Sequence, residues 1–384
     1  MTAFKNLNIW DGLDDNFSPE VSSITFDQNG ITDLGGADTD ALDLGGLYLI
    51  PGLIDAHVHL CLDPEVMDPL AHGRVPRDQQ LKDMAHRAEQ MLQAGITTAR
   101  DLGAGAWLEL ELREQIANRH LPGPRLVCAG QPLTTPNGHC HFWGGIASDA
   151  DSACEVLQRQ FTHDVDLIKV MATGGTMTPD SKPHQAQFSV DLLKMIVASA
   201  AEKQCLVAAH CHGTQGIRNA TMAGVRTIEH CSWVSESGWG QGYDDDLVTE
   251  IAQRGIWISP TVNYGWRRYS GAREQLLIDN FSRMRNAGVK FIASTDAGIP
   301  NVFHHQLPQA LPVFAHLAGF NPVQVLKSAT SDAAEAIGLG RVTGRIQVGY
   351  SADFMLLDRN PLDDLSALLS PIAVFARGDS VGAF

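Results

Sequence analysis

The sequence lacks the features that would take it out of the class of ordinary cytosolic proteins. No apolar run approaches the ~20 residues that a membrane-spanning helix needs. Residues 1–12 hold one lysine and no long apolar stretch, unlike a secretory signal. The seven cysteines are an odd number without a Cys-x-x-Cys pair, which is typical of free thiols in a reducing compartment. We therefore expect a cytoplasmic protein.

Basic residues are also scarce. The chain has 28 Lys and Arg against 44 Asp and Glu, a formal net charge of -16. Binding to a nucleic acid or to an anionic membrane surface needs clustered Lys and Arg, so neither partner is expected. We interpret most of the acidic excess as solvated surface. A small-molecule substrate is the expected partner, and the possibility that the chain forms a homo-oligomer stays open. What the chain does have is histidine, with 15 residues and several His-x-His pairs.

The two ends of the chain have the pattern of β-structure. Residues 1–50 contain short alternating runs broken by Asn-Gly and Gly-Gly, which are hairpin signals, and residues 340–384 have the same character. Chain termini often lie close together. We therefore predict that residues 1–50 and 340–384 pair into one small β-sandwich domain.

Residues 51–339 show a different pattern, in which short apolar runs alternate with amphipathic helical segments. The runs are nearly free of charge until their C-terminal ends, as in strands that are buried on both faces of a parallel sheet. There are eight of them, at residues 49–59, 96–103, 125–130, 166–172, 205–211, 226–231, 256–261 and 290–297. Eight β-then-α units predict an α/β fold, a TIM-type (β/α)8 barrel. A doubly wound open sheet is the alternative, but no Gly-x-Gly-x-x-Gly follows the first strand.

Polar residues gather at the C-terminal ends of these runs, on the face where barrel enzymes carry catalysis. His57 and His59 end the first run, and the two-residue period of a strand places them on one side. Two imidazoles in that arrangement form half of a metal site. His210 ends the fifth run, His230 the sixth and Asp296 the eighth.

Lys169 lies inside the fourth apolar run. Lysine is rarely buried unless it is paired, so this residue needs a partner or a chemical change. As an unmodified lysine it could pair with Asp166 or with another carboxylate. In that case the two first-run histidines, His210 and Asp296 would still form a one-metal site.

These residues, in this order, resemble those of the amidohydrolase superfamily of metal-dependent hydrolases. Residues 51–59, with the sequence PGLIDAHVH, are similar to its opening motif, and the resemblance spans essentially the whole chain. The runs PNGHCHFWGG and LIKVMATGG are most similar to the imidazolonepropionase-related and Xaa-Pro dipeptidase-like members.

The resemblance implies a binuclear centre with two Zn²⁺ ions per chain. The implied metal ligands are His57, His59, Lys169, His210, His230 and Asp296. Lys169 would bridge the ions as a carbamate formed with CO2, because an ammonium group cannot ligate a cation. Metal ions ~3.5–4 Å apart can share a hydroxide that attacks a carbonyl. Asp296 would take the proton and pass it to the leaving amine.

The loop of residues 134–145 is long, glycine-rich and aromatic, which suggests a pocket wall. The resemblance implies that His139 contacts the substrate carbonyl and stabilises the developing oxyanion. Relatives often continue with Asp, whereas this chain has Cys140-His141. Either His139 or His141 can therefore be the contact, and a solvent-facing loop histidine is the alternative.

Four further residues lie at or near the ends of these runs and are weaker candidates for the site. His212 shares a face with His210 but lies one step further out, so we expect it to support the site rather than to bind metal. Alternation points Cys211 and Cys231 towards the helix layer, and we interpret both as packing residues. Tyr264, beyond the seventh run, is a weaker candidate for substrate binding.

The predicted function is zinc-dependent hydrolysis of an amide bond in a small substrate such as a dipeptide or an N-acyl amino acid. Ring opening or deamination of a cyclic amide or heterocycle is the first alternative. Lys169 argues against it, because one-metal members usually lack the bridging lysine. Lactone or phosphotriester hydrolysis would use the same metal pair. A non-catalytic metal-binding protein is the last alternative, and the retained Asp296 argues against it.

Overall fold

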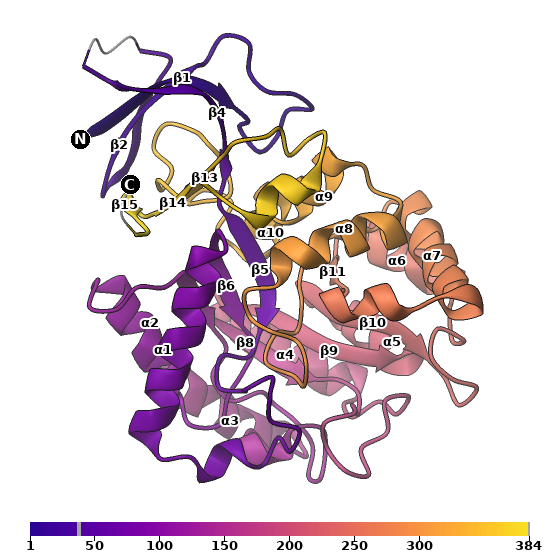
Figure 1. Ribbon diagram of the computed structural model, residues 1–384. Coiled ribbons are helices and arrows are strands. Elements are labelled where there is room, and N and C mark those ends of the chain that lie inside the picture. Colours follow the sequence, from indigo (N-terminus) through magenta and orange to yellow (C-terminus); the bar gives the residue numbers. More distant parts are fainter. Residues whose placement is uncertain (37–39, 383–384) are drawn as a thin grey trace.

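The two ends of the chain come together in one mixed sheet. A computed structural model of the protein describes residues 1–36 and 40–382. Within it, β4 pairs antiparallel with β13, so N-terminal and C-terminal strands are direct neighbours (Figure 1). The sheet has the order β15-β14-β13-β4-β1-β2-β3. Its strands are β1 (Thr2–Ile9), β2 (Ser23–Asp27), β3 (Gly30–Leu34), β4 (Leu42–Pro51), β13 (Phe354–Leu357), β14 (Ala373–Ala376) and β15 (Asp379–Ser380).

Phenylalanine rings form the core of this sheet. Phe26 on β2 and Phe375 on β14 have ring centroids 5.4 Å apart, although three strands separate β2 from β14 in the sheet order. Neighbouring strands are ~4.8 Å apart, so a flat sheet would keep these rings well over ~10 Å from each other. The sheet therefore curves around the rings, which include Phe4 and Phe354.

The central part of the chain supplies eight parallel strands in two sheets. β5 (Leu53–Val58), β6 (Ile96–Asp101) and β7 (Arg125–Cys128) form a three-stranded sheet. β8 (Leu167–Met171), β9 (Leu206–Gly213), β10 (Thr227–Val234), β11 (Trp257–Ser259) and β12 (Lys290–Phe291) form a five-stranded one. Backbone hydrogen bonds join the two sheets at both seams, from Leu133 N to Lys169 O at 2.8 Å and from Ala56 N to Ala293 O at 3.2 Å. The predicted α/β fold with parallel strands is confirmed.

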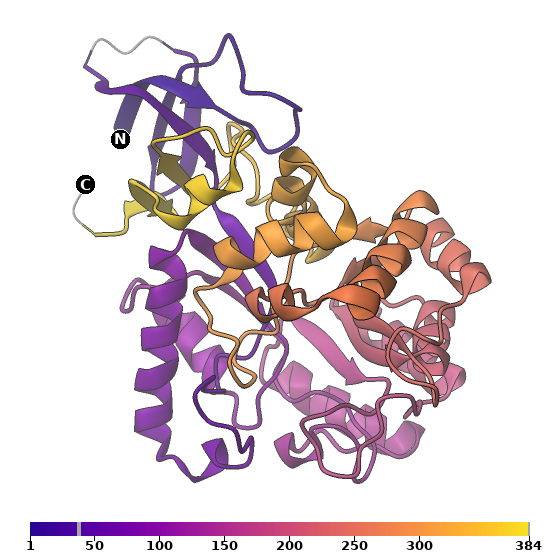
Figure 2. The same cartoon turned by 45° about the vertical axis from the view of Figure 1, so that its right-hand side comes forward.

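Helices alternate with these strands and flank them in both views (Figures 1 and 2). They are α1 (Arg77–Gln93), α2 (Leu108–Ala117), α3 (Ala150–Thr162), α4 (Val190–Glu202), α5 (Thr214–Ala223), α6 (Asp245–Gln253), α7 (Gly271–Asn286), α8 (Leu307–Ala318), α9 (Pro322–Ser328) and α10 (Ser331–Ala336). Short 3-10 helices occur at η1 (His72–Arg74), η2 (His141–Trp143), η3 (Tyr264–Arg268) and η4 (Leu365–Leu369). Among the described helices, none is both long and apolar enough to span a membrane.

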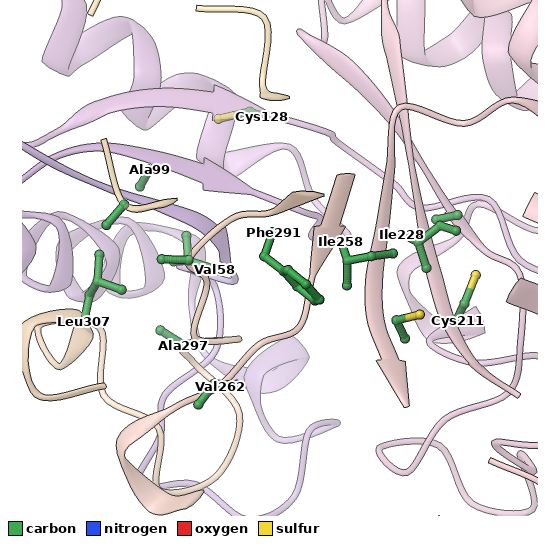
Figure 3. Packing of buried hydrophobic residues seen from close by; sticks show 14 of the residues in the cluster. Val58, Ala99, Cys128, Cys211, Ile228, Ile258, Val262, Phe291, Ala297 and Leu307 are labelled. Atoms are coloured by element: carbon green, nitrogen blue, oxygen red, sulfur yellow. The ribbon is translucent and has the colours of Figure 1, made fainter. Parts of the chain in front are cut away.

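The strands are apolar because both of their faces are covered. All residues of β5, β6 and β8 are buried. Figure 3 shows Val58, Ile228, Ile258 and Phe291 among the packed side chains of this core. A charged side chain in such a strand must find a partner inside the protein. The charged residues on these strands therefore identify the site.

Glu109 in α2 is a buried carboxyl group outside that site. Neither carboxylate oxygen has a hydrogen-bond partner among the described residues. Burial, with a smaller contribution from Asp101, raises the pKa of Glu109 from 4.5 to about 8. Between these two pKa values the folded chain keeps a proton on Glu109 that the unfolded chain has released. Glu109 therefore lowers the stability of the fold progressively as the pH rises from about 4.5 to about 8. We expect Glu109→Gln to be more stable than the wild type by on the order of 1–3 kcal/mol at pH 8 and by much less at pH 5.

Urea unfolding of both proteins at pH 5 and pH 8 measures this difference. Glu114→Gln is the matched control, because Glu114 is an exposed carboxylate on the same helix. A Glu109→Gln stability gain that does not change with pH would contradict the assignment.

Candidate metal centre

The first part of the centre consists of His57, His59 and Asp296. The Nε2 atoms of His57 and His59, at the end of β5, lie 3.3 Å apart. Asp296 Oδ1 is 3.3 Å from His57 Nε2 and 3.5 Å from His59 Nε2. The Asp296 backbone has a φ of 62°, and its N–H donates to His57 O at 2.9 Å. Aspartate tolerates this left-handed conformation better than most residues, and here it accompanies the turn that brings the carboxylate over the histidines.

The second part of the centre consists of His210 on β9 and His230 on β10. Their ring centroids are 4.7 Å apart, and the His230 ring lies 5.1 Å from that of His57. Ligand atoms of His57, His230 and Asp296 all lie within 4.8 Å of one another. The strand ends therefore bring the predicted histidines and Asp296 into one compact cluster.

Each of these imidazoles uses one ring nitrogen for an outer hydrogen bond, and the Nε2 atoms of His57 and His59 face each other and Asp296 inside the cluster. His59 Nδ1 donates to Gly103 O at 2.9 Å, and His210 Nε2 donates to Gly174 O at 3.0 Å. The other outer contacts, both 2.9 Å long, are His57 Nδ1 with Glu229 Oε2 and His230 Nδ1 with Thr261 Oγ1. Metal-binding histidines in proteins have this arrangement, because the outer acceptor fixes the tautomer and the ring orientation. The cluster therefore fits a metal ion.

The electrostatics of the cluster favour neutral imidazoles. Burial, followed by the charge of Lys169, lowers the pKa of His59 to about 3 and that of His57 well below its usual value. Burial also lowers the pKa values of His210 and His230 far below the usual range. Neutral imidazole is the form that ligates a metal ion.

Lys169 is fully buried on β8, and its Nζ atom has no hydrogen-bond partner among the described residues. Asp166 is already used, because it accepts from Arg113 Nη1 at 2.8 Å and from Cys128 N at 2.7 Å. Burial lowers the pKa of Lys169 to about 8, against the opposing charges of Glu229 and Asp296. Lys169 therefore does not pair with Asp166, the partner that the sequence suggested for an unmodified lysine. A buried amine without a partner is the feature that a chemical change would resolve.

Glu229 and Arg100, two residues without a predicted role, support the cluster. Arg100 Nη2 donates to Glu229 Oε1 at 2.9 Å, and Arg100 Nε donates to Ala56 O at 2.7 Å. Both side chains are almost completely buried. Each of them is a charged residue inside an apolar run of the sequence, and the same signal identified Lys169.

His139 and His141 lie in different surroundings. His139 is buried, with its ring centroid 4.6 Å from that of His210, and its Nδ1 has no partner among the described residues. His141 is half-buried, and its Nδ1 donates to Gly138 O at 3.0 Å. The structure therefore brings His139, rather than His141, to the cluster.

His212 lies closer to the cluster than expected. One ring nitrogen of His212 lies within 4.8 Å of a ring nitrogen of His210 and of one of His230. The Nδ1 atom of His212 is 3.0 Å from Ser232 Oγ. Cys211 is a core residue, as expected. Cys231 is also buried but lines a cavity, because His230 and Cys231 adopt left-handed φ values of 65° and 49° that break the strand alternation.

A cavity of about 430 Å³ opens beside the cluster. His212, His230 and Asp296 line one part of it. Tyr264 is not among the lining residues, and the Arg267 guanidinium stacks over its ring at 3.6 Å. Trp266 and Tyr269, from the same segment, line the cavity instead.

The parallel α/β fold carries a buried histidine–aspartate cluster that could hold a metal ion. The sequence profile of the amidohydrolase family matches residues 48–381, and the chain belongs to that family. It is therefore an enzyme, a hydrolase that acts on carbon–nitrogen bonds. The predicted family is confirmed.

The chain is similar to several known proteins. Ochratoxinase from Aspergillus niger is 28% identical over 355 residues, covering 85% of this chain and 73% of the relative. Imidazolonepropionase from Deinococcus deserti is 27% identical over 369 residues, covering 88% and 84%. Among solved structures, a Xaa-Pro dipeptidase with bound methionine superposes with a TM-score of 0.85 at 24% identity over 99% of both chains.

Glu229→Gln is expected to weaken binding of a metal ion at the cluster about 10- to 100-fold, because the outer partner of His57 loses its charge. It is also expected to cost ~3–5 kcal/mol of stability, since the buried Arg100 loses its counter-ion. Competition with a metal chelator and urea unfolding measure the two effects. Glu236→Gln, which changes an exposed carboxylate, is the control. Unchanged metal affinity in a folded Glu229→Gln protein would contradict the role.

Proposed function

We propose that this protein is a zinc-dependent amidohydrolase that cleaves the amide bond of a small substrate such as a dipeptide or an N-acyl amino acid. The observation that carries the proposal is the buried cluster of imidazoles and Asp296, whose ligand atoms form two groups within 4.8 Å, together with a buried lysine that has no hydrogen-bond partner among the described residues. A nitrogen-rich ligand set favours zinc over magnesium or calcium. The Xaa-Pro dipeptidase among the similar structures supports a dipeptide as one substrate class.

In this proposal each ligand has a defined place. His57, His59 and Asp296 would hold one zinc ion, His210 and His230 would hold the second, and Lys169, as a carbamate, would supply oxygen ligands to both. The carbamate forms when the neutral amine of Lys169 adds to CO2, which makes an N–C bond and releases one proton. This reaction replaces the partnerless amine with an anion that has two ligand oxygens.

The side chains around the substrate supply the proton transfers and the polar contacts. Bound zinc would lower the pKa of water and polarise the substrate carbonyl. Asp296 accepts the proton of the attacking water and returns it to the leaving amine. His139 donates a hydrogen bond to the carbonyl oxygen as negative charge develops there. Glu229 holds His57 in the tautomer that leaves Nε2 free.

We also propose that residues 51–339 form a closed (β/α)8 barrel. The hydrogen bonds at both seams of the parallel sheets support closure. The curved sheet formed by the described residues of the segments 1–50 and 340–384 forms the β-sandwich domain, supported by the ring contacts across it. A cytosolic location stays part of the proposal, supported by the seven free cysteines.

Metal analysis of protein purified without chelators tests the centre. We expect close to two zinc ions per chain, and clearly fewer than one would contradict the proposal. A screen of dipeptides, N-acyl amino acids and cyclic amides tests the reaction. Turnover of linear amides is expected, whereas turnover of cyclic amides alone would establish the ring-opening alternative.

A further inference from the structure

β6 ends in two consecutive charged residues, Arg100 and Asp101, and both side chains are buried. Successive side chains of a strand point to opposite faces, so these two residues serve different parts of the molecule. Arg100 pairs with Glu229, which is the outer partner of His57. Asp101 faces the other way, and its contacts lie around His59.

The carboxylate of Asp101 accepts two main-chain hydrogen bonds. Its Oδ2 atom accepts from Leu60 N at 2.8 Å, and its Oδ1 atom accepts from Gly103 N at 3.0 Å. Leu60 directly follows His59, so the first bond fixes the chain next to the point where the imidazole is attached. The second bond closes a turn two residues after the aspartate, a local pattern that Asp side chains favour. One side chain therefore ties together two segments that are distant in the sequence.

The turn at Gly103 directs a carbonyl group at the ring of His59. Gly103 has a φ of 133°, a conformation that favours glycine, and a Cβ atom there would clash with the Pro132 ring. Gly103 O accepts from His59 Nδ1 at 2.9 Å. Because a carbonyl oxygen can only accept, this bond requires the tautomer of His59 with its hydrogen on Nδ1. The lone pair of Nε2 is then directed into the cluster, where His57 Nε2 and Asp296 Oδ1 lie.

Two other side chains hold the same stretch of chain through its carbonyl groups. His304 Nε2 donates to His59 O at 3.1 Å, and Arg87 Nε donates to Leu60 O at 3.0 Å. These bonds fix the position of the backbone. Asp101 differs from both, because the same carboxylate also holds the turn whose carbonyl group orients the imidazole.

We propose that Asp101 is a positioning residue of the metal centre, which orients His59 as a ligand through the main chain of Leu60 and Gly103. Without this carboxylate the turn loses the bond that holds its carbonyl group against the ring. The imidazole then adopts both tautomers and more than one orientation. A nitrogen that carries a hydrogen cannot bind a metal ion, so the ion is held more weakly.

The end of β6 then orients both histidines of the first part of the centre. Arg100 acts on His57 through its bond to Glu229, and Asp101 acts on His59 through the Gly103 turn. This inference rests on the proposed function for the identity of the ion, which is zinc. The orientation of the His59 ring does not depend on that identity, because its hydrogen bonds involve the protein alone.

NMR spectroscopy of the histidine ring nitrogens in chelator-treated protein tests the tautomer without a metal ion or a substrate. The signals of His59 are those that are lost in His59→Gln. In the wild type, His59 should carry its hydrogen on Nδ1, whereas Asp101→Asn should show a mixture of both tautomers. Asparagine has the size of aspartate, but its amide group cannot accept at both positions. A wild-type His59 with its hydrogen on Nε2 would overturn the inference, whether or not the variant folds.

Competition with a zinc chelator measures the effect on binding of Zn²⁺. Asp101→Asn should weaken zinc binding about tenfold or more. Asp166→Asn is the matched control and should bind zinc as the wild type does. Asp166 also accepts from a main-chain N–H, that of Cys128, but it holds β7 rather than either segment that orients His59. A purely structural Asp101 would give a variant that unfolds at lower urea concentration with unchanged tautomer and zinc affinity, which would overturn the inference.

These measurements separate the inference from the proposed function. Unchanged tautomer and zinc affinity in Asp101→Asn, with turnover of a linear amide by the wild type, would overturn the positioning role and retain the proposed function. A wild type that bound no zinc and turned over no amide, while its His59 tautomer still depended on Asp101, would overturn the proposed function and support the role of Asp101 in orienting the ring.

Discussion

Replacement of Asp296 with asparagine is expected to lower kcat by about a thousandfold or more, with the fold intact. Asparagine has the same shape but cannot accept the proton that the carboxylate takes from water. Asp296 has a left-handed backbone with a φ of 62°, and asparagine is among the few residues that tolerate this conformation. The backbone bond from Asp296 N to His57 O is therefore expected to persist. Steady-state kinetics on the best amide substrate and circular dichroism provide the two measurements.

Asp246→Asn is the matched control, because it makes the same chemical change on the exposed first turn of α6. It should retain the kcat of the wild type. An Asp296→Asn protein that kept more than about a tenth of the wild-type kcat would remove Asp296 as the proton acceptor. Zinc content measured on the same samples separates a lost base from a lost metal ion.

Local sequence patterns were sufficient to predict the main features of the fold and the polar residues at the strand ends, whereas the full set of candidate ligands came from the family resemblance. The runs that became β5 to β12 are apolar because both faces of these strands are buried, and this is visible without knowing their neighbours. His57 and His59 follow from the two-residue period of a strand. The proximity of His230 to His57 depends on packing between β5 and β10, which no local pattern contains. The family resemblance supplied that pairing.

The supporting residues could not be predicted, because their roles depend on partners that are distant in the sequence. Arg100 and Glu229 are separated by 129 residues and meet only in the folded chain. The alternation rule also failed at the end of β10, where the register with β9 shifts between His230 and Val234. Cys231 consequently lines the cavity as well as packing in the core. Alternation placed His212 on the same face as His210, and the structure brings its ligand nitrogen within 4.8 Å of those of His210 and His230.

Loop geometry explains why Tyr264, a candidate for substrate binding, does not line the cavity. Asn263 caps η3 by accepting from Gly265 N at 3.1 Å, and the resulting turn sets the direction of each aromatic side chain after it. Tyr264 then stacks with Arg267, while Trp266 and Tyr269 line the cavity. A turn of this kind has no periodicity, so the sequence identified an aromatic segment without showing which ring lines the cavity.

Lys169→Met is expected to have opposite effects on stability and on function. Without the proposed bridging carbamate, zinc content should fall from the expected two ions per chain to about one, and kcat should fall at least about 100-fold. In chelator-treated protein the same substitution should stabilise the fold by ~1–3 kcal/mol, because it removes a buried amine without a partner. Methionine is unbranched and flexible, and fills a comparable apolar space. Metal analysis, kinetics and urea unfolding in the presence of chelator measure the three quantities.

A gain in stability accompanied by a loss of zinc is what distinguishes a functional lysine from a structural one. A lysine kept for an ion pair would leave its partner charge buried when replaced, and unfolding would then become easier by ~3–5 kcal/mol. Lys203→Met controls for the change in hydropathy, because Lys203 is exposed at the end of α4. A Lys169→Met protein that bound two zinc ions would exclude the bridge. One that was less stable than the chelated wild type would show that the amine has a favourable partner in the folded chain. The direction of the stability change therefore decides whether Lys169 contributes to folding or to the metal centre.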